Sequence, residues 1–378
     1  MGIKGKRLRV GINAHLLSGE AGYRRAGIHH YIYQVLRHLP PELAEYVVFT
    51  RQPQLLADVA GMETAVTRWP TEKRIIRIAW EQLAWPWQAV GRRVDLLHSM
   101  AFVTPLLSFQ PSVVTVYDLS FEYFPDRFPE RQRWYLHTQT KRSCQQAARV
   151  ITISESSRQD VSALYGIPLH HIDVIYPGLD AAYRPASAAD VAAFRQENGL
   201  PEKFVLHVGT LQPRKNIPVL IEAFAHIPDE DVHLVLVGGK GWLFDEIFER
   251  VVALGLAERV HFPGYVADEA LPLWYAAASV FVFPSVYEGF GMPVVEAMAC
   301  GTPVVASQAS SMPEAGGDAA LYFSPDDAGQ LAAQLTAVLS QPDLAASLRQ
   351  KGLVQCRQFS WEAAGRQTAE TYQKAVRT

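Results

Sequence analysis

Short apolar runs that suit buried β-strands alternate with helical segments through both halves of the sequence. Such alternation indicates a parallel sheet covered by helices on both faces, and its presence in each half indicates two sheets. The predicted fold class is therefore α/β, with two doubly wound Rossmann-like domains that face each other across a cleft and bind ligands at strand carboxyl ends. The expected strands are residues 8–12, 47–50, 96–98, 113–117, 150–153 and 174–176, followed by 204–208, 234–237, 260–262, 280–283 and 304–307.

The chain has 378 residues, which is more than one ordinary domain holds. A turn sequence over residues 177–180 follows a strand and marks the expected boundary. We therefore predict an N-terminal domain over residues 1–180, a C-terminal domain over 181–357 and a final helical segment over 358–378. Ser360 suits the N-cap of that last helix, which no strand follows and which can fold back onto the N-terminal domain.

The composition indicates a cytoplasmic protein. No apolar run approaches the roughly 18 residues that span a bilayer. The basic start of the chain lacks the apolar stretch and cleavage site of a signal peptide. Cys144, Cys300 and Cys356 lie far apart without Cys-x-x-Cys spacing, which argues against a disulfide framework or a structural zinc and favours three buried thiols.

Charge is distributed unevenly between the two halves. Residues 1–180 carry 21 Lys and Arg against 16 Asp and Glu, whereas residues 181–378 carry 14 against 22. A positive N-terminal half suits an acidic partner, such as a phosphate-bearing lipid or an anionic membrane. An uneven surface composition without function is the alternative, and we expect no nucleic-acid partner.

The segment 280–301 carries the most specific signal, because it reads as a strand, a tight loop and a helix. Pro293 suits the first helical position, and Gly301 suits the left-handed position after the last turn. Gly289 and Gly291 let the backbone approach a ligand closely, and the free N–H groups at the helix start can bind an anion.

Two carboxylates frame this segment. Glu288 lies at the mouth of the glycine loop, and Glu296 is expected in the first turn of the helix. Together they can hold hydroxyl groups on either side of a diphosphate. For Glu296, complementing the helix dipole is an adequate alternative. Glu288 has a weaker structural explanation, because it lies between an aromatic residue and a glycine.

Residues 209–216 follow the first strand of the same domain and end in an adjacent Arg214 and Lys215. A guanidinium fork beside an ammonium charge is suited to a diphosphate, although a solvated basic pair is the alternative. Because both loops follow strands of one sheet, the anion site and the two carboxylates should converge at one edge.

Pro213-Arg-Lys-Asn216 and Glu288-Gly-Phe-Gly-x-x-x-x-Glu296, a Glu-x7-Glu motif, resemble family 4 of the retaining glycosyltransferases, which have the GT-B fold. The likeness extends almost end to end. It implies transfer of a hexose from a UDP- or GDP-linked donor to a glycan or lipid-linked saccharide in polysaccharide biosynthesis, without a further cofactor. Further stretches that carry it are residues 154–156, 176–180, 262–265 and 360–362.

The resemblance also implies roles for individual residues. Glu288 would contact hydroxyls of the transferred sugar, Glu296 would hold the ribose, and the basic pair would hold the diphosphate. The backbone near residue 265 would contact the base. The donor-binding residues implied in this way are Gly27, Gly209, Thr210, Arg214, Lys215, Tyr265, Val266, Gly289, Phe290, Gly291, Met292 and Glu296.

In the first domain the resemblance is looser. Residues 19–31, which include Gly27, look like the glycine-rich loop of the family. Asp118 matches a family position and is a second catalytic candidate, either binding an acceptor hydroxyl or capping the next turn. Tyr117 stands where relatives often carry His, and a phenol with a pKa near 10 is a poor base at pH 7.

No metal site is expected. The Asp-x-Asp pattern of metal-using sugar transferases occurs only at Asp229-Glu-Asp231, in a polar turn before a strand. Neutralising the leaving diphosphate would then fall to Arg214, Lys215 and helix N-termini. A nucleotide-sugar epimerase of similar fold and a non-catalytic two-domain sugar-binding protein are the alternative functions.

Residues 68–93 combine six Lys and Arg with four Trp. Ile76, Trp80, Leu83 and Trp87 fall on one helical stripe, with basic residues at 73, 74 and 77 elsewhere around it. This pattern predicts a helix lying in a membrane interface near a lipid-linked acceptor. The alternative is a core helix packed on the first sheet.

Overall fold

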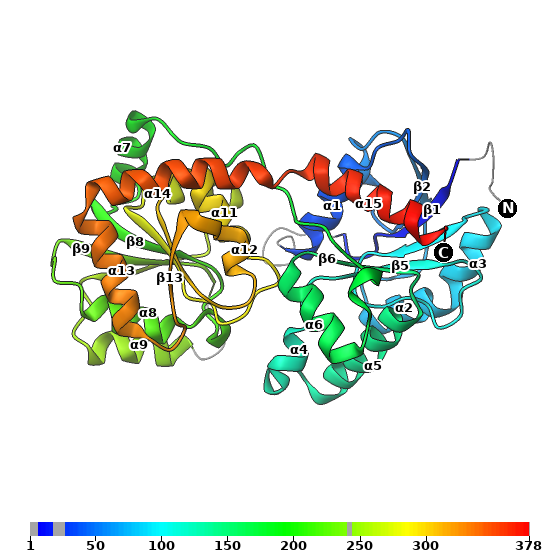
Figure 1. Ribbon diagram of the computed structural model, residues 1–378, viewed down its shortest axis with the longest axis horizontal. Helices are drawn as coiled ribbons and strands as arrows, with labels where there is room; N and C mark the ends of the chain where they lie inside the picture. The colour runs from blue at the N-terminus through cyan, green and yellow to red at the C-terminus, as the bar shows by residue number, and fades with distance from the viewer. Residues whose placement is uncertain (1–6, 18–26, 240–243, 378) are drawn as a thin grey trace. The chain divides into compact units, whose positions relative to one another are not determined.

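The computed structural model describes residues 7–17, 27–239 and 244–377. They form two compact units, one made of residues 1–178 and 360–378 and the other of residues 179–359. The sequence placed these boundaries at residues 180 and 357. Each unit has a parallel sheet between two layers of helices (Figure 1), so the predicted class of two Rossmann-like α/β domains is confirmed.

Seven parallel strands form the sheet in the described part of the first unit, in the order β3-β2-β1-β4-β5-β6-β7. β3 was not expected from the sequence, and β7 lies two residues earlier than predicted. Central β1 pairs on both sides, with Ile12 opposite Val48 and His98. The strands are β1 (Arg9–Asn13), β2 (Glu45–Thr50), β3 (Met62–Val66), β4 (Leu96–Ser99), β5 (Ser112–Val116), β6 (Arg149–Thr152) and β7 (Ile172–Val174).

Helices cover both faces of this sheet. One face carries α1 (Ile28–His38) and α15 (Trp361–Ala375), and the other carries α2 (Arg74–Ala79), α3 (Trp85–Gly91), α5 (Glu130–Gln146) and α6 (Glu155–Tyr165) (Figure 1). A π-helical turn, η3 (Trp80–Ala84), joins α2 to α3, and the short α4 (Ser120–Tyr123) follows β5.

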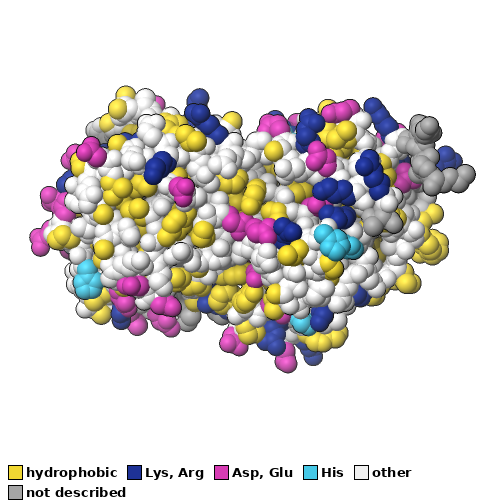
Figure 2. All heavy atoms as spheres, in the orientation of Figure 1, with side chains coloured by type: hydrophobic (Ala, Val, Ile, Leu, Met, Phe, Trp, Pro, Cys, Tyr) yellow, Lys and Arg dark blue, Asp and Glu magenta, His cyan; other side chains and the backbone are white. Residues whose placement is uncertain are grey.

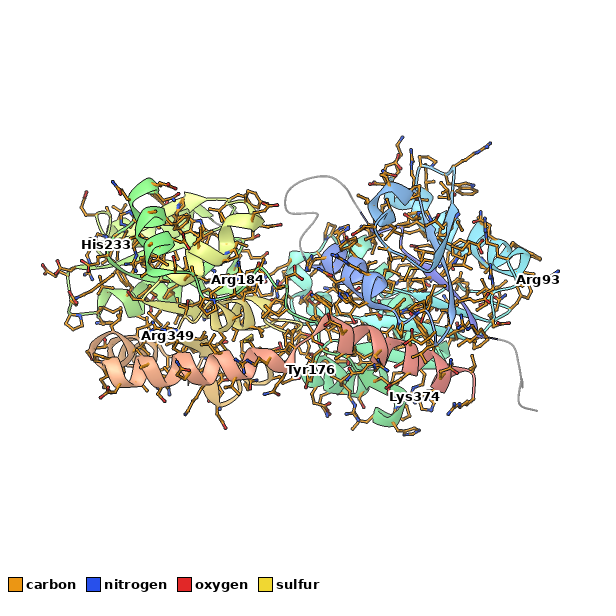
Figure 3. All side chains as sticks on the ribbon, turned by 90° about the horizontal axis from the view of Figure 1, so that it is seen from above. Arg93, Tyr176, Arg184, His233, Arg349 and Lys374 are labelled. Atoms are coloured by element: carbon orange, nitrogen blue, oxygen red, sulfur yellow. The ribbon has the colours of Figure 1, made fainter. Side chains whose placement is uncertain are left out.

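The C-terminal helix α15 is part of the first unit. Ser360 caps it as expected, because the Ser360 side chain accepts a hydrogen bond from Ala363 N at 3.1 Å. Gly365 packs so closely on α1 that an added Cβ would lie 2.1 Å from His38 O. The Tyr372 hydroxyl lies 2.7 Å from His98 Nδ1. Lys374, which Figure 3 labels near the end of α15, donates to Asp173 at 2.8 Å.

The sheet in the described part of the second unit has six parallel strands in the order β10-β9-β8-β11-β12-β13. The four-residue β13 was not expected from the sequence. The helix α8 (Ile217–Ala225) buries Leu220, Ile221 and Phe224 completely against the sheet. The strands are β8 (Lys203–Val208), β9 (Val232–Val237), β10 (Val260–Gly264), β11 (Val280–Phe283), β12 (Val304–Ser307) and β13 (Ala320–Phe323).

Two helical layers cover the second sheet as well (Figure 1). One layer holds α8 (Ile217–Ala225), α9 (Phe244–Ala253) and α13 (Ala328–Ser340). The other layer holds α7 (Ala188–Glu197), α10 (Leu271–Ala277), α11 (Met292–Ala299), α12 (Met312–Gly316) and α14 (Pro342–Gln355).

The strand orders place one topological switch point in each sheet. In the first unit the order reverses between β1 and β4, and in the second it reverses between β8 and β11. At such points the loops after two neighbouring strands diverge to opposite faces, which opens a crevice at the carboxyl ends. These two places are therefore where each fold is best suited to bind a ligand.

Cys144, Cys300 and Cys356 are buried free thiols, as predicted. Burial raises the pKa of Cys144 and of Cys300 to about 12. Within the described ranges, no helix is long and apolar enough to cross a membrane.

Candidate active site

The switch point of the second unit brings together the two loops that the sequence singled out. The loop after β8 contains Arg214 and Lys215, and the loop after β11 contains Glu288. A backbone hydrogen bond of 3.0 Å from Val286 N to Arg214 O ties the loops to each other. The structure thus brings the basic pair and the Glu288 carboxylate together at one edge of the sheet, where the sequence predicted that the two loops converge.

Glu288 bridges both cations. Its Oε2 accepts from Arg214 at 2.6 Å, and its Oε1 accepts from Lys215 Nζ at 2.7 Å. Arg214 also donates to Tyr287 O at 2.8 Å, which fixes the guanidinium against the second loop. We call Glu288, Arg214 and Lys215 the clamp. It carries two positive charges and one negative charge, which gives these three side chains a net charge of +1.

Burial and charge act on the clamp in opposite directions. Burial by itself would raise the pKa of the Glu288 carboxyl, but Lys215 and Arg214 outweigh it and hold the pKa below its usual range. Burial lowers the pKa of the Lys215 ammonium, while Glu288 opposes that change. Lys215 Nζ also lies 4.6 Å from the centre of the Phe283 ring, a favourable cation–π distance. The carboxylate is therefore ionised in a site where charges interact strongly.

The backbone after β8 lies close to the clamp at Gly209, which has no side chain. Gly209 has a φ of 154°, and a Cβ at this position would lie 3.4 Å from both Lys215 Cε and His207 Nε2. Thr210 follows it, partly exposed. His207 was not predicted from the sequence. Burial lowers its pKa to about 3, so the ring is neutral, and its Nε2 has no hydrogen-bond partner among the described residues.

The glycine loop leads directly into α11. Gly291, with a φ of 106°, is the N-cap residue, and Met292 is the first helical residue. Gly289 is buried, and the Phe290 ring packs edge-on against Phe359 at 5.1 Å. The loop therefore presents backbone rather than side chains at the helix start. Its position is set by Ser310 and Ser311, whose hydroxyls donate to Glu288 O at 2.7 and 3.0 Å.

Glu296 lies later in the helix than predicted. Because α11 begins at Met292, Pro293 is its second residue and Glu296 belongs to the second turn, so the dipole explanation for this carboxylate is wrong. Gly301 has the expected left-handed conformation, with a φ of 77°. The Tyr275 hydroxyl donates to Glu296 Oε2 at 2.8 Å. Burial raises the pKa of Tyr275 well above its usual value, so Tyr275 remains a proton donor to this carboxylate.

Tyr265 and Val266 follow β10, the edge strand. Gly264 O accepts from Gly238 N at 2.9 Å, and a Cβ on Gly238 would lie 2.0 Å from Gly209 O. This packing places the ends of β10, β9 and β8 side by side. Tyr265 is exposed and Val266 is partly exposed at this edge.

Two protein families match the chain. Residues 25–183 match the family described as Glycosyltransferase Family 4, and residues 190–354 match the family described as Glycosyl transferases group 1. The O-antigen chain mannosyltransferase B of Escherichia coli is 36% identical over 266 residues, which cover 69% of this chain and 70% of that protein. The chain is a GT-B glycosyltransferase. For three further curated relatives, the matched stretches span 54%, 48% and 60% of their lengths.

Solved structures support the same fold for this glycosyltransferase. The sucrose-phosphate synthase of Thermosynechococcus elongatus is 24% identical, with a TM-score of 0.78 over 98% of this chain and 100% of that one. The Anabaena protein HepE in complex with UDP-glucose is 23% identical, with a TM-score of 0.75 over 97% and 100%. At these identities the likeness concerns the fold.

The remaining predicted residues of the glycosyltransferase lie in the first unit. Gly27 precedes α1 with a φ of 70°, and residues 19–22 of the predicted glycine-rich loop fall outside the described residues. Asp118 Oδ1 accepts from Ser120 N at 2.9 Å, which is the capping contact that the sequence left as one of two options. Tyr117 donates to Met100 O at 2.6 Å, and burial raises its pKa well above its usual value, so the phenol keeps its proton near pH 7 and does not act as a base.

Asp229 and Asp231 form a turn at the amino end of β9, opposite to the clamp. Lys203 pairs with Asp229 at 3.0 Å, and Asp231 N donates to Asp229 at the same distance. Within the described ranges, no three His, Cys, Asp or Glu side chains gather as metal ligands.

Proposed function

We propose that this glycosyltransferase retains configuration at the transferred sugar and moves a hexose from a UDP- or GDP-linked donor to a glycan or lipid-linked saccharide in polysaccharide biosynthesis. The observation that carries the proposal is the buried clamp at the switch point, where two cations exceed one carboxylate. A diphosphate supplies the missing negative charge, and a carboxylate beside it suits sugar hydroxyls.

We propose a role for each member of the clamp. Arg214 and Lys215 hold the diphosphate, and the backbone N–H groups of Phe290 and Gly291 add donors beside it. When phosphate oxygens pair with the cations, Glu288 is released to accept hydrogen bonds from the hexose. Because two cations stabilise the leaving diphosphate, no metal ion is required. The donor is further lined by Gly209, Thr210, Gly289 and Met292, and its base is contacted by Tyr265 and Val266. In the first unit, Gly27 contacts the phosphates and Asp118 binds the acceptor.

The choice of donor to test follows from the relatives. HepE is described in complex with UDP-glucose, and the E. coli relative is named a mannosyltransferase. UDP-glucose and GDP-mannose are therefore the first donors to screen by thermal shift. A ligand at 100 times its Kd stabilises a protein by about 2.7 kcal/mol.

The decisive assay measures nucleoside diphosphate release with and without a saccharide acceptor. A glycosyltransferase releases the diphosphate in proportion to the acceptor consumed. An epimerase converts the donor without acceptor and releases none, and a binding protein leaves the donor intact. Either of the last two outcomes would contradict the proposed function.

Glu296→Ala should weaken donor binding by roughly 10- to 100-fold and leave turnover at saturating donor nearly unchanged. A ribose contact is equally strong in the ground state and the transition state, so its loss raises Kd rather than lowering kcat. Titration calorimetry with the nucleoside diphosphate measures this. Tyr275→Phe removes the hydrogen bond to Glu296 but keeps the carboxylate, and should have a smaller effect. Intact donor affinity in Glu296→Ala would contradict the ribose role.

The prediction that the whole stripe of residues 76, 80, 83 and 87 faces a membrane is wrong in part. Trp80 is 0% exposed and stacks on Trp85 in the core of the first unit, with ring centres 6.1 Å apart. Arg77 is half-buried and pairs with Glu81. Leu83 and Trp87, however, are 65% and 67% exposed. The helical segment therefore serves both the core and the surface.

A second loop extends the exposed apolar surface. Phe109 is 64% exposed and meets Trp87 edge-on at 5.1 Å. Gln82 fastens this loop to η3, because its amide donates to Thr104 O at 3.3 Å and accepts from Leu106 N at 2.7 Å. The apolar ridge, as we name it, consists of Leu83, Trp87, Val90, Leu106, Leu107 and Phe109.

We propose that the apolar ridge docks the enzyme on an anionic membrane. The sequence gives the N-terminal half a net charge of +5, and on the face shown in Figure 2 Lys and Arg side chains gather mostly over the first unit. Exposed apolar side chains on a domain with a positive net charge suit insertion at the headgroup level of anionic lipid.

Trp87→Ser with Phe109→Ser should reduce sedimentation with anionic vesicles by roughly 10-fold or more, because two aromatic side chains lose their burial in lipid. Wild-type binding should weaken with salt. Phe248→Ser, which alters a 52% exposed aromatic in the second unit, is the matched control. The proposed docking role would be contradicted if the wild type bound neutral and anionic vesicles equally, or if the double variant bound anionic vesicles as well as the wild type.

A further inference from the structure

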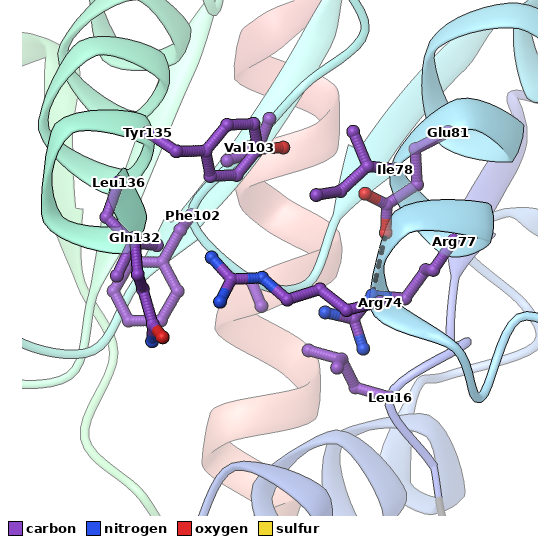
Figure 4. Close-up of a pocket in the computed structure, with 11 residues that line it drawn as sticks. Leu16, Arg74, Arg77, Ile78, Glu81, Phe102, Val103, Gln132, Tyr135 and Leu136 are labelled. Carbon is purple, nitrogen blue, oxygen red and sulfur yellow. Dashed lines mark ion pairs between the residues drawn. The ribbon is translucent and has the colours of Figure 1, made fainter. Parts of the chain in front are cut away.

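The switch point of the first unit has a pocket of its own, with a volume of about 220 Å³ (Figure 4). Leu16, which follows β1, and residues 101–103, which follow β4, form its walls at the carboxyl edge of the sheet. α2 and α5 supply the other sides. The pocket thus occupies in the first sheet the place that the clamp occupies in the second.

Two arginines line the pocket, and only one of them has a carboxylate partner among the described residues. Arg77 Nε lies 3.8 Å from Glu81 Oε1, which also accepts from Asn13 Nδ2 at 3.1 Å. The Arg74 guanidinium lies 5.9 Å from the centre of the Tyr135 ring and makes no ion pair within the described ranges. One positive charge in the pocket is therefore not neutralised.

The arrangement directs this charge into the pocket. Figure 4 shows Arg74 extending toward Gln132 and Tyr135 of α5, while Arg77 lies beside Glu81. An arginine held over an aromatic face keeps its fork of N–H groups available in the plane of the guanidinium. Gln132 adds an amide at the wall that α5 supplies.

The wall after β4 is held in an uncommon conformation. Phe102 has a φ of 57°, and its N donates to Thr115 O at 2.9 Å. A bulky residue with positive φ is strained, and such strain persists where the surrounding structure fixes it, most often at functional sites. The loop is thus shaped in advance at the mouth of the pocket.

We propose that this pocket binds a phosphate group carried by the acceptor, with Arg74 as the main contact and Arg77, oriented by Glu81, as the second. The inference rests on the proposed function and specifies the acceptor as a phosphorylated saccharide or a lipid phosphate. A phosphate has three oxygens and can engage two guanidinium groups at once. α2, which carries both arginines, is continuous with η3 and α3, which carry part of the apolar ridge.

The test is titration calorimetry on the full chain with two probes, a hexose 1-phosphate and farnesyl phosphate below its micelle concentration. Both should lose roughly 10-fold or more in affinity in Arg74→Gln. Arg133→Gln, an exposed arginine on α5, removes the same charge outside the pocket and should change affinity less than twofold. The tighter probe identifies whether the phosphate belongs to a soluble sugar or to a lipid.

Two further titrations separate this pocket from the donor site. Phosphate binding should survive in the Arg214→Ala, Lys215→Ala variant, and binding of nucleoside diphosphate should be unchanged in Arg74→Gln. Equal probe affinity in wild type and Arg74→Gln, or an equal loss in Arg133→Gln, would overturn the proposal. Absence of nucleotide binding in the wild type would instead contradict the proposed function and leave the phosphate result standing.

Discussion

Glu288→Gln should lower turnover by roughly 100-fold or more while leaving affinity for the free nucleoside diphosphate within a few-fold of wild type. The amide keeps the size of the side chain but accepts fewer and weaker hydrogen bonds from sugar hydroxyls. In the free enzyme the carboxylate pairs with Arg214 and Lys215 at 2.6 and 2.7 Å and offsets one of their two positive charges. Its loss makes these cations more available to a diphosphate, so any change in nucleotide affinity should be toward tighter binding. Steady-state kinetics and calorimetry measure the two quantities separately.

A control for this prediction is Glu222→Gln, which removes a partly exposed, ion-paired carboxylate from α8 in the same unit. Its turnover should equal that of the wild type. Near wild-type turnover in Glu288→Gln would eliminate the sugar-orienting role. Weaker nucleotide binding with normal turnover would show that Glu288 acts by positioning the cations instead.

The strands that the sequence did not reveal are those with little apolar pattern. β3 is an edge strand, and Ala65 is its one buried residue. β13 has four residues and only its two ends are buried. The central strands of both sheets are buried on both faces, which produces the continuous Val, Ile and Leu runs that were recognised. Strands that form because of tertiary contacts, without a periodic apolar pattern of their own, could not be predicted from the sequence.

In the candidate site, too, features with a local cause could be predicted and features set by tertiary contacts could not. Strand-to-helix loops could be located from glycines, prolines and charges, because each has a local conformational cause. The bridging of Arg214 and Lys215 by Glu288 depends on the pairing of β8 with β11, across 73 residues of sequence. Tyr275, which donates to Glu296, belongs to no motif. Arg74 looked like the basic flank of an amphipathic helix, and only the fold of the first unit places it in a pocket.

The Arg214→Ala, Lys215→Ala double variant should lose roughly 1,000-fold or more in turnover, and wild-type activity should persist in excess EDTA. Removing a single donor to a developing negative charge typically costs about 100- to 1,000-fold, and here both cations that face the leaving diphosphate are removed. If the clamp stabilises the diphosphate in place of a metal ion, EDTA has no metal ion to remove and the rate stays unchanged. Initial rates with and without EDTA, for both proteins, measure the prediction.

The structure also specifies how to separate loss of chemistry from loss of folding. The double variant leaves the buried Glu288 without either cation, so burial should raise the pKa of this carboxyl and its protonated form should be favoured. A thermal melt compared with Glu288→Gln and with the triple variant shows whether this strain unfolds the second unit. Lys203→Ala removes an exposed lysine paired with Asp229 at the opposite end of β8, and should be fully active. Restoration of wild-type rates only by added magnesium or manganese, or a folded double variant with normal rates, would transfer the role of the clamp to a metal ion or to the backbone at the start of α11.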